Sequence, residues 1–206
     1  MPFDLSAGRS GRTLMPELDL LERAVAYTRL SLQLVAPDVL HAPTPCEEWD
    51  LVTLLGHMDD SLAALADAAD VGYVAIRPLP RPDPANAVTS IKARACALLA
   101  AWTAGGGADL VSVAGCPLSA RVLVSTGALE ITTHGWDVAR ACGVDRQIPG
   151  ALAQVLLRML PDLVHDSDRV TRFAHAVDVP PWWSPSDRLV AALGRQPVWS
   201  AHSRPV

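Results

Sequence analysis

Apolar residues recur at spacings of three and four along much of this chain, and this periodicity predicts helices. The clearest stretch begins at Leu51, where a leucine stripe follows Asp50, a residue type that commonly caps a helix N-terminus. Proline or serine near the start and glycine or proline after the end mark the other helical stretches. The predicted helices cover residues 16–36, 51–71, 84–102, 117–142, 150–164 and 185–193. Residues 110–116 are rich in β-branched side chains, which indicates either a short strand or a loop.

Four of these predicted helices are about 20 residues long, and long connections join them. This pattern predicts an all-α fold: a four-helix bundle with crossover connections, followed by a short irregular or helical C-terminal tail. We expect a flexible leader over residues 1–14, a metal-binding bundle over 15–165 and a C-terminal extension over 166–206 packed on it. The proline-stiffened connections at 37–49 and 72–83 are typical of walls around a site.

The charge balance of the chain argues against two classes of binding partner, nucleic acids and anionic membranes. The chain has 17 basic and 22 acidic residues, giving a net charge of -5, while half of its residues are hydrophobic. Nucleic-acid and anionic-membrane binding both favour a basic surface, which this composition does not supply. No uncharged apolar run reaches the roughly 18 residues of a membrane span, and the N-terminus lacks the apolar block of a secretory signal. We therefore expect a cytoplasmic globular protein, monomeric or homodimeric, that binds neither nucleic acid nor membrane.

The cysteines and most of the histidines carry weak signals. The four cysteines are widely spaced and include no CxxC pair, so reduced thiols are expected. Cys46 would be a candidate nucleophile at a helix N-terminus, but Asp50 is the better cap, and we expect Cys46 to be structural. Solvated, capping or pocket-lining roles are expected for His41, His165, His175 and His202. The chain contains no GxSxG, P-loop or GxGxxG motif.

The strongest candidate site combines two predicted helices. Glu130 and His134 are four residues apart, so both side chains leave the same face of the fourth long helix. His57 lies beside the apolar stripe of the second, and could join them if these helices are neighbours. Two imidazoles and one carboxylate suit Zn²⁺ with an open position, and also Fe²⁺ or Ni²⁺. The alternatives are a surface ion pair for Glu130 and His134 and a core histidine for His57. The mostly apolar helix favours the metal site, because a glutamate within it needs a partner.

Two sequence segments add a family resemblance. TPCEEWDLVTLLGHM (44–58) and ALEITTHGWDVARACG (128–143) resemble the signature segments of the DinB/YfiT-like superfamily. They are most similar to its actinobacterial branch, which includes mycothiol-dependent maleylpyruvate isomerase and many uncharacterised metal-binding relatives. SPSDRLVAALGRQP (184–197) resembles the short tail of those uncharacterised relatives. The resemblance implies a four-helix bundle with one divalent metal, usually zinc or nickel, whose ligands carry over to His57, Glu130 and His134. Many superfamily members have histidine where this chain has Glu130, whereas the mycothiol-dependent branch uses glutamate.

The resemblance also implies a class of chemistry. It indicates a metal-dependent thiol S-transferase or thiol-dependent isomerase that uses a mycothiol-type thiol on a small electrophile. The larger isomerases have an additional C-terminal domain that this chain is expected to lack, which disfavours maleylpyruvate isomerisation itself. Two other classes stay open: a non-catalytic metal- or ligand-binding protein, and a hydrolase in which activated water is the nucleophile. The sequence assigns neither a catalytic residue nor the residues that bind the thiol.

Overall fold

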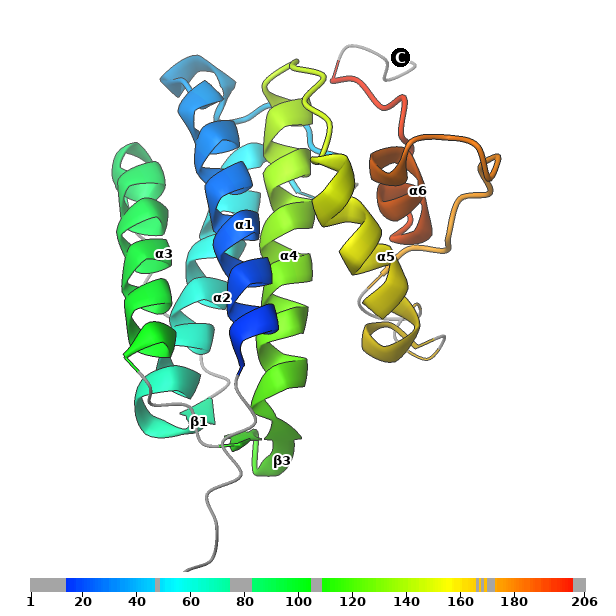
Figure 1. Cartoon of the computed structure of the whole chain (residues 1–206). Helices are drawn as coiled ribbons and strands as arrows, with labels where there is room; N and C mark the ends of the chain where they lie inside the picture. Colours follow the sequence, from blue (N-terminus) through cyan, green and yellow to red (C-terminus); the bar gives the residue numbers. More distant parts are fainter. Residues whose placement is uncertain are drawn as a thin grey trace, which may run out of the picture.

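Four long helices lie side by side in a computed structural model of the chain, which describes residues 14–46, 49–74, 83–104, 109–165, 167, 169 and 173–201 (Figure 1). The long helices are α1 (Met15–Ser31), α2 (Leu51–Val71), α3 (Ala87–Thr103) and α4 (Ala120–Ala141). Two shorter helices follow, α5 (Gly150–Leu163) and α6 (Pro185–Ala192); α5 packs on α4, and α6 packs on α5. The predicted all-α bundle is confirmed.

The core of the bundle is made by the apolar stripes of the long helices. Leu54 and Leu55 of α2, Leu98 of α3 and Trp136 of α4 are fully buried. The closest pairings are α1 with α4 and α2 with α3, and α2 also contacts α4. That last contact matters for function, because it joins the two helices that carry the candidate ligands.

Helix α1 approaches α4 closely at Gly135. A Cβ atom built there would overlap the hydroxyl of Thr28 and come within 3.1 Å of the Thr28 Cα. The Thr28 hydroxyl donates a hydrogen bond of 2.7 Å to the carbonyl oxygen of Ile131. Glycine therefore sets the separation of the two helices at this level of the bundle.

We expect Gly135→Ala to destabilise the protein by about 1–3 kcal/mol, because the added methyl group must displace the α1 backbone as well as a side chain. Urea unfolding at equilibrium would measure this loss. Gly150→Ala is the matched control: its added Cβ meets nothing within 4 Å, so the change should be neutral or slightly stabilising. Equal stability of the two variants would contradict close packing at Gly135.

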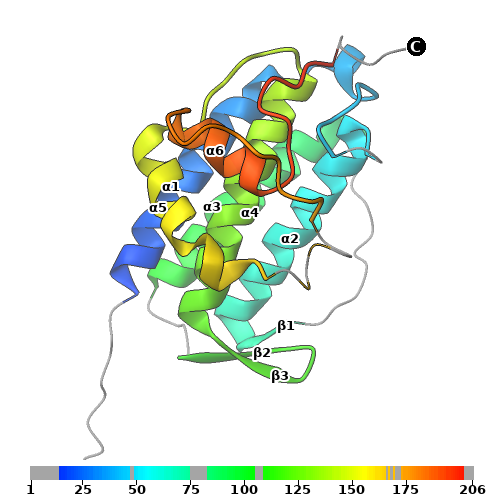
Figure 2. The ribbon, with the colours of Figure 1, turned by 90° about the vertical axis from the view of Figure 1, so that its right-hand side faces the viewer.

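A small sheet closes one end of the bundle, opposite the connection between α1 and α2 (Figure 2). Its strands are β1 (Tyr73–Val74), β2 (Leu110–Val113) and β3 (Cys116–Ser119), with β1 parallel to β2 and β2 antiparallel to β3. The predicted start of the fourth long helix at Pro117 is therefore wrong. Ala114 and Gly115 have φ values of 51° and 84°, which turn the chain into a hairpin, so residues 116–119 pair with β2 and α4 begins at Ala120.

Local caps fix other helix ends as the sequence predicts. The Asp50 carboxylate accepts a hydrogen bond of 3.0 Å from the backbone N–H of Thr53 at the start of α2. The Ser184 hydroxyl accepts one of 3.1 Å from Asp187 at the start of α6. Helix α1 ends five residues before its predicted limit, at Ser31, and short 3₁₀ turns at Leu32–Leu34 and Pro37–Val39 continue the chain.

Two expectations about the domain organisation stay predictions. Apart from Leu14, the expected leader lies outside the described residues, and the expected boundary at residue 165 stays a prediction. No helix in the described part of the chain is both long and apolar enough to cross a membrane.

Candidate metal centre

Three potential ligand atoms converge between α2 and α4. His57 lies in the second turn of α2, while Glu130 and His134 lie on one face of α4. Nε2 of His57 is 2.6 Å from Oε1 of Glu130, and Nε2 of His134 is 3.1 Å from the same oxygen. One ligand atom from each residue lies within 4.8 Å of the others. The structure thus brings together the three residues that the sequence predicts as ligands.

The surroundings of the trio differ from those of a surface ion pair. His134 is only 5 % exposed, whereas the side chains of His57 and Glu130 are about one-third exposed. The two histidine rings meet edge to face, with centroids 5.0 Å apart. One histidine is therefore fixed in the protein interior, and the other two groups remain within reach of solvent.

Trp49 covers the His57 ring from the loop that precedes α2. Its ring centroid is 4.8 Å from that of His57 and 6.2 Å from that of His134. The Thr44 hydroxyl donates to the Trp49 carbonyl oxygen at 2.8 Å, and the Trp49 N–H donates to the Cys46 carbonyl oxygen at 2.8 Å. This hydrogen-bonded loop holds the indole against the site.

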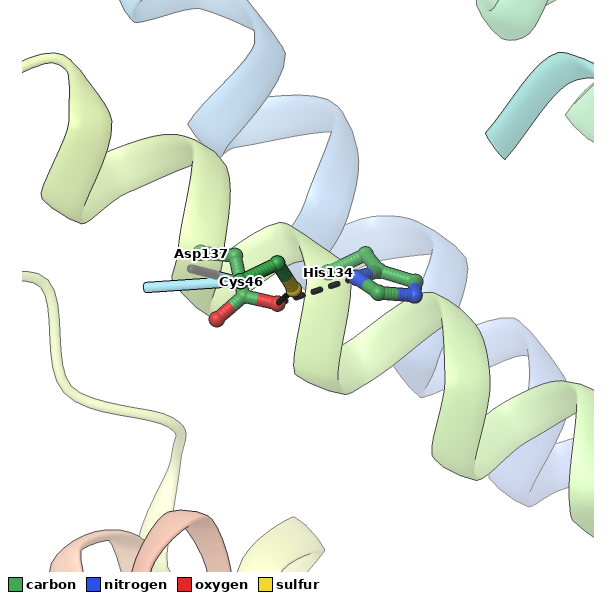
Figure 3. A group of neighbouring side chains, drawn as sticks. All are labelled: Cys46, His134 and Asp137. Carbon is green, nitrogen blue, oxygen red and sulfur yellow. Dashed lines mark hydrogen bonds and ion pairs between the residues drawn. The ribbon is translucent and has the colours of Figure 1, made fainter. Parts of the chain in front are cut away.

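The second nitrogen of His134 belongs to another cluster. Nδ1 of His134 donates to Oδ2 of Asp137 at 2.9 Å, and Asp137 is completely buried. The Cys46 thiol donates to the same carboxylate oxygen at 3.4 Å (Figure 3). Arg195 donates from Nη2 to Asp137 Oδ2 at 3.0 Å and to Cys46 Sγ at 3.3 Å. Asp137 therefore orients the His134 ring, as carboxylates behind metal-ligating histidines commonly do.

Sequence reasoning missed this cluster. Asp137 follows His134 by three residues on the same helix, so its position on the same face could have been recognised. Arg195 and Cys46 are 149 residues apart, and no local pattern links them. Cys46 was expected to be structural, and its thiol in fact lies against the carboxylate that orients His134.

The charges of the trio reinforce one another. Burial alone would raise the pKa of Glu130, but His134 and His57 hold that pKa well below its ordinary value. Burial alone would lower the pKa of His134, whereas the charges and hydrogen bonds of Glu130 and Asp137 hold it well above its ordinary value. Burial would likewise raise the pKa of Asp137, yet Arg195 and His134 lower it. Glu130, His134 and Asp137 therefore stabilise one another in their charged forms.

The donor set fits a divalent cation. Two imidazole nitrogens and a carboxylate oxygen supply three ligands of the kinds that Zn²⁺, Ni²⁺ and Fe²⁺ accept, and they leave further coordination positions to other groups. With Nδ1 of His134 bonded to Asp137, Nε2 is the nitrogen that faces Glu130. A cation at the trio would replace the proton on that nitrogen.

A mainly apolar pocket opens beside two of these residues. All four long helices contribute to its wall, which includes Glu130 and His134. Its apolar lining includes Val25, Leu32, Met58, Ile91, Ala95 and Ile131. Arg29, which is exposed, also borders the pocket. Carbon atoms therefore border the pocket on most sides, and two residues of the trio belong to its wall.

The other histidines do not join this site. His41 is exposed, and its Nδ1 lies 3.1 Å from the carboxylate of the helix cap Asp50. His165 and His175 are exposed, and neither belongs to a cluster of potential metal ligands in the described ranges. His202 lies outside the described residues.

Comparison with known proteins identifies the family. The model of the mycothiol maleylpyruvate isomerase N-terminal domain matches residues 21–139, a span that includes His57, Glu130, His134 and Asp137. Two uncharacterized proteins of Mycobacterium tuberculosis, from strains CDC 1551 / Oshkosh and H37Rv, are each 29% identical over 167 residues. Those matches cover 78% of this chain and 87% of each relative. No solved structure matches the chain. The chain belongs to the family of mycothiol maleylpyruvate isomerase N-terminal domains.

Proposed function

We propose that this protein is a divalent-metal-dependent enzyme that transfers a mycothiol-type thiol to a small electrophile. His57, Glu130 and His134 hold the metal, for which Zn²⁺ is the expected ion and Ni²⁺ or Fe²⁺ fits the same donors. One observation carries the proposal: three ligand atoms lie within 4.8 Å of one another, and two of the three residues line an apolar pocket. Membership of a family named for a mycothiol-dependent reaction supports the choice of thiol.

The residues of the site have distinct tasks in this proposal. A bound divalent cation supplies a Lewis acid that favours the thiolate form of the thiol near neutral pH. Glu130 contributes the negative charge of the ligand set, and Asp137 keeps the remaining His134 proton on Nδ1. Trp49 limits the access of water to the His57 ring by packing against it at a tilt of 49°.

The pocket indicates the kind of electrophile. Its wall is mainly aliphatic. Transfer of the apolar part of a substrate from water into such a pocket is favourable, because apolar surface is removed from water. The sulfur would attack a carbon atom of this substrate beside Glu130 and His134. The new carbon–sulfur bond would form as the bond from that carbon to a halide or an epoxide oxygen breaks. The thiol proton would pass to solvent, or to the oxygen of the opened epoxide. An apolar wall also disfavours water as the competing nucleophile, which supports thiol transfer over hydrolysis.

Isomerisation is the second candidate reaction, and the family description favours it. The same thiol would add to a carbon–carbon double bond, rotation would follow, and elimination of the thiol would restore the double bond. Both reactions need the same thiol and metal, but only transfer leaves sulfur attached to the product.

The decisive experiment combines thiol binding with product analysis. Calorimetry should show mycothiol binding to Zn²⁺-loaded protein and much weaker binding after chelation, because the thiol sulfur needs the metal. The Zn²⁺-loaded protein would then be incubated with mycothiol and one electrophile at a time: an aryl halide, an alkyl epoxide or an unsaturated diacid. Liquid chromatography with mass spectrometry would detect S-conjugates or isomers.

The controls separate the alternatives. His134→Ala should abolish product, whereas His41→Ala, at an exposed histidine outside the trio, should not. Equal mycothiol affinity with and without metal would contradict a role of the metal in thiol binding. Hydrolysed rather than conjugated electrophile would assign water as the nucleophile, and turnover of no electrophile would favour a non-catalytic binding protein.

A further inference from the structure

Arg195 enters the candidate metal centre from the C-terminal part of the chain. It lies outside the span of residues 21–139 that matches the family model. It directly follows Gly194, whose φ of 82° ends α6. Its guanidinium group nevertheless reaches Asp137 of α4, directly behind His134.

The end of α6 fixes the direction in which Arg195 leaves the helix. The N–H of Arg195 bonds to the carbonyl oxygen of Val190, and that of Gly194 bonds to Ala191, both at 2.9 Å. This pair of bonds is the Schellman arrangement, which favours glycine in the left-handed region. Any larger residue at position 194 would also overlap Ala174, because a Cβ there would lie 2.7–2.9 Å from its atoms.

The guanidinium group is held at several points. Nη1 donates to the carbonyl oxygen of Leu193 at 2.9 Å, while Nη2 and Nε donate to the two carboxylate oxygens of Asp137 at 3.0 and 3.4 Å. Nη2 also donates to Cys46 Sγ at 3.3 Å. The side chain is only 11% exposed. Arg195 thus joins the end of α6 to α4 and to the loop that carries Trp49.

Asp137 depends on this partner. Its side chain is completely buried, and a buried carboxylate without a countercharge is strongly destabilised. The fork of Arg195 contacts both carboxylate oxygens, which fixes the plane of the carboxylate as well as its position. Oδ2 then accepts the bond from Nδ1 of His134. The orientation of the imidazole is therefore set through Asp137 by a residue beyond the bundle.

We infer that Arg195 is a positioning residue of the metal centre: it fixes Asp137 against Nδ1 of His134 and so keeps Nε2 directed toward Glu130 and His57. This inference rests on the proposed metal centre. It makes α6 and the residue after Gly194 part of the site, although neither supplies a ligand.

Arg195→Met tests the inference, because it removes the charge and the hydrogen-bonding fork but keeps a long side chain. Zn²⁺ affinity, measured at fixed pH by competition with a chromophoric chelator, should fall about tenfold or more. Arg188→Met is the matched control, since Arg188 is an exposed arginine on α6. The Zn²⁺ affinity of this variant should equal that of the parent protein. Arg195→Lys keeps the charge without the planar fork and should recover part of the lost affinity.

Two further measurements separate positioning from a general loss of stability. If Arg195 acts through Asp137, Arg195→Met should cause little additional loss of affinity in an Asp137→Asn background. In Co²⁺-loaded protein, the paramagnetically shifted Nδ1–H signal of His134 should exchange with solvent faster in Arg195→Met than in Arg188→Met. A purely structural role would lower the melting temperature without changing this signal selectively.

The outcomes are distinct. Zn²⁺ affinity equal to that of the parent in folded Arg195→Met would overturn the inference. The inference would also be overturned if Arg195→Met lowered the affinity by the same factor in the Asp137→Asn background as in the parent protein. If circular dichroism shows that Arg195→Met does not fold, Arg195→Lys takes its place in the same cycle and is held to the same criteria. Failure of the parent protein to bind Zn²⁺ would instead overturn the proposed function on which the inference depends.

Discussion

Glu130→Gln should weaken Zn²⁺ binding at least about 100-fold while leaving the helical bundle folded. The substitution keeps the length and one oxygen of the side chain but removes the negative charge that Nε2 of His57 and of His134 now contact at 2.6 and 3.1 Å. A neutral amide oxygen is a poor ligand for a divalent cation. Competition titration would measure the metal affinity, and circular dichroism would report the fold.

Glu22→Gln is the control for this change. Glu22 is an exposed glutamate on α1, so the same chemical substitution there should leave Zn²⁺ affinity unaltered. If Glu130 were only an ion-pair partner, its replacement would change stability by about 1 kcal/mol or less and leave metal content alone. Unchanged Zn²⁺ affinity in Glu130→Gln would remove Glu130 from the ligand set and leave two histidines.

Zn²⁺ affinity should also fall as the pH is lowered from about 8 to 6, by about tenfold per pH unit for each proton that the metal displaces. The sign follows from His134, whose pKa is raised well above its ordinary value, mainly because Glu130 and Asp137 outweigh the opposing effect of burial. Below that pKa, Nε2 carries a proton that the metal must replace. The pKa of Glu130 is held well below its ordinary value, so its carboxylate stays ionised throughout this range.

Titrations at several pH values would test this dependence, and calorimetry in buffers of different ionisation enthalpy would count the protons released. Zn²⁺ binding at neutral pH should release a proton from His134. Asp137→Asn should make the pH dependence shallower near neutrality, because it removes one of the two carboxylates that raise the pKa of His134. A flat pH profile without proton release would exclude Nε2 of His134 as a metal ligand.

The parts of the fold that the sequence predicts correctly are those fixed by interactions between residues close together in the chain. Asp50 and Ser184 cap α2 and α6 because their side chains reach backbone groups three residues ahead. The start of α4 could not be predicted in this way. Residues 116–119 form a strand because β2 lies beside them, and this pairing competes with the helical periodicity that continues from Ala120.

The same distinction applies to the candidate site. The spacing of Glu130 and His134 places them on one helical face, while the addition of His57 requires only that α2 and α4 be neighbours. Arg195 was beyond sequence reasoning, because its position depends on how α5 and α6 pack and on the turn at Gly194. The candidate ligands are therefore predictable from a sequence pattern, whereas the residues behind them depend on the tertiary structure.

The close approach of α1 to α4 at Gly135 has a consequence for how the substrate range of the proposed enzyme could diversify. Thr28, which meets Gly135, and Ile131, whose carbonyl oxygen accepts the Thr28 hydroxyl, both line the pocket. A mutation that widened the pocket from this side would also loosen the bundle, so selection for stability would oppose it. Ile91 and Ala95 line the pocket from α3, away from that contact. We therefore expect evolutionary change in substrate preference to accumulate on α3, while the α1–α4 contact stays constrained.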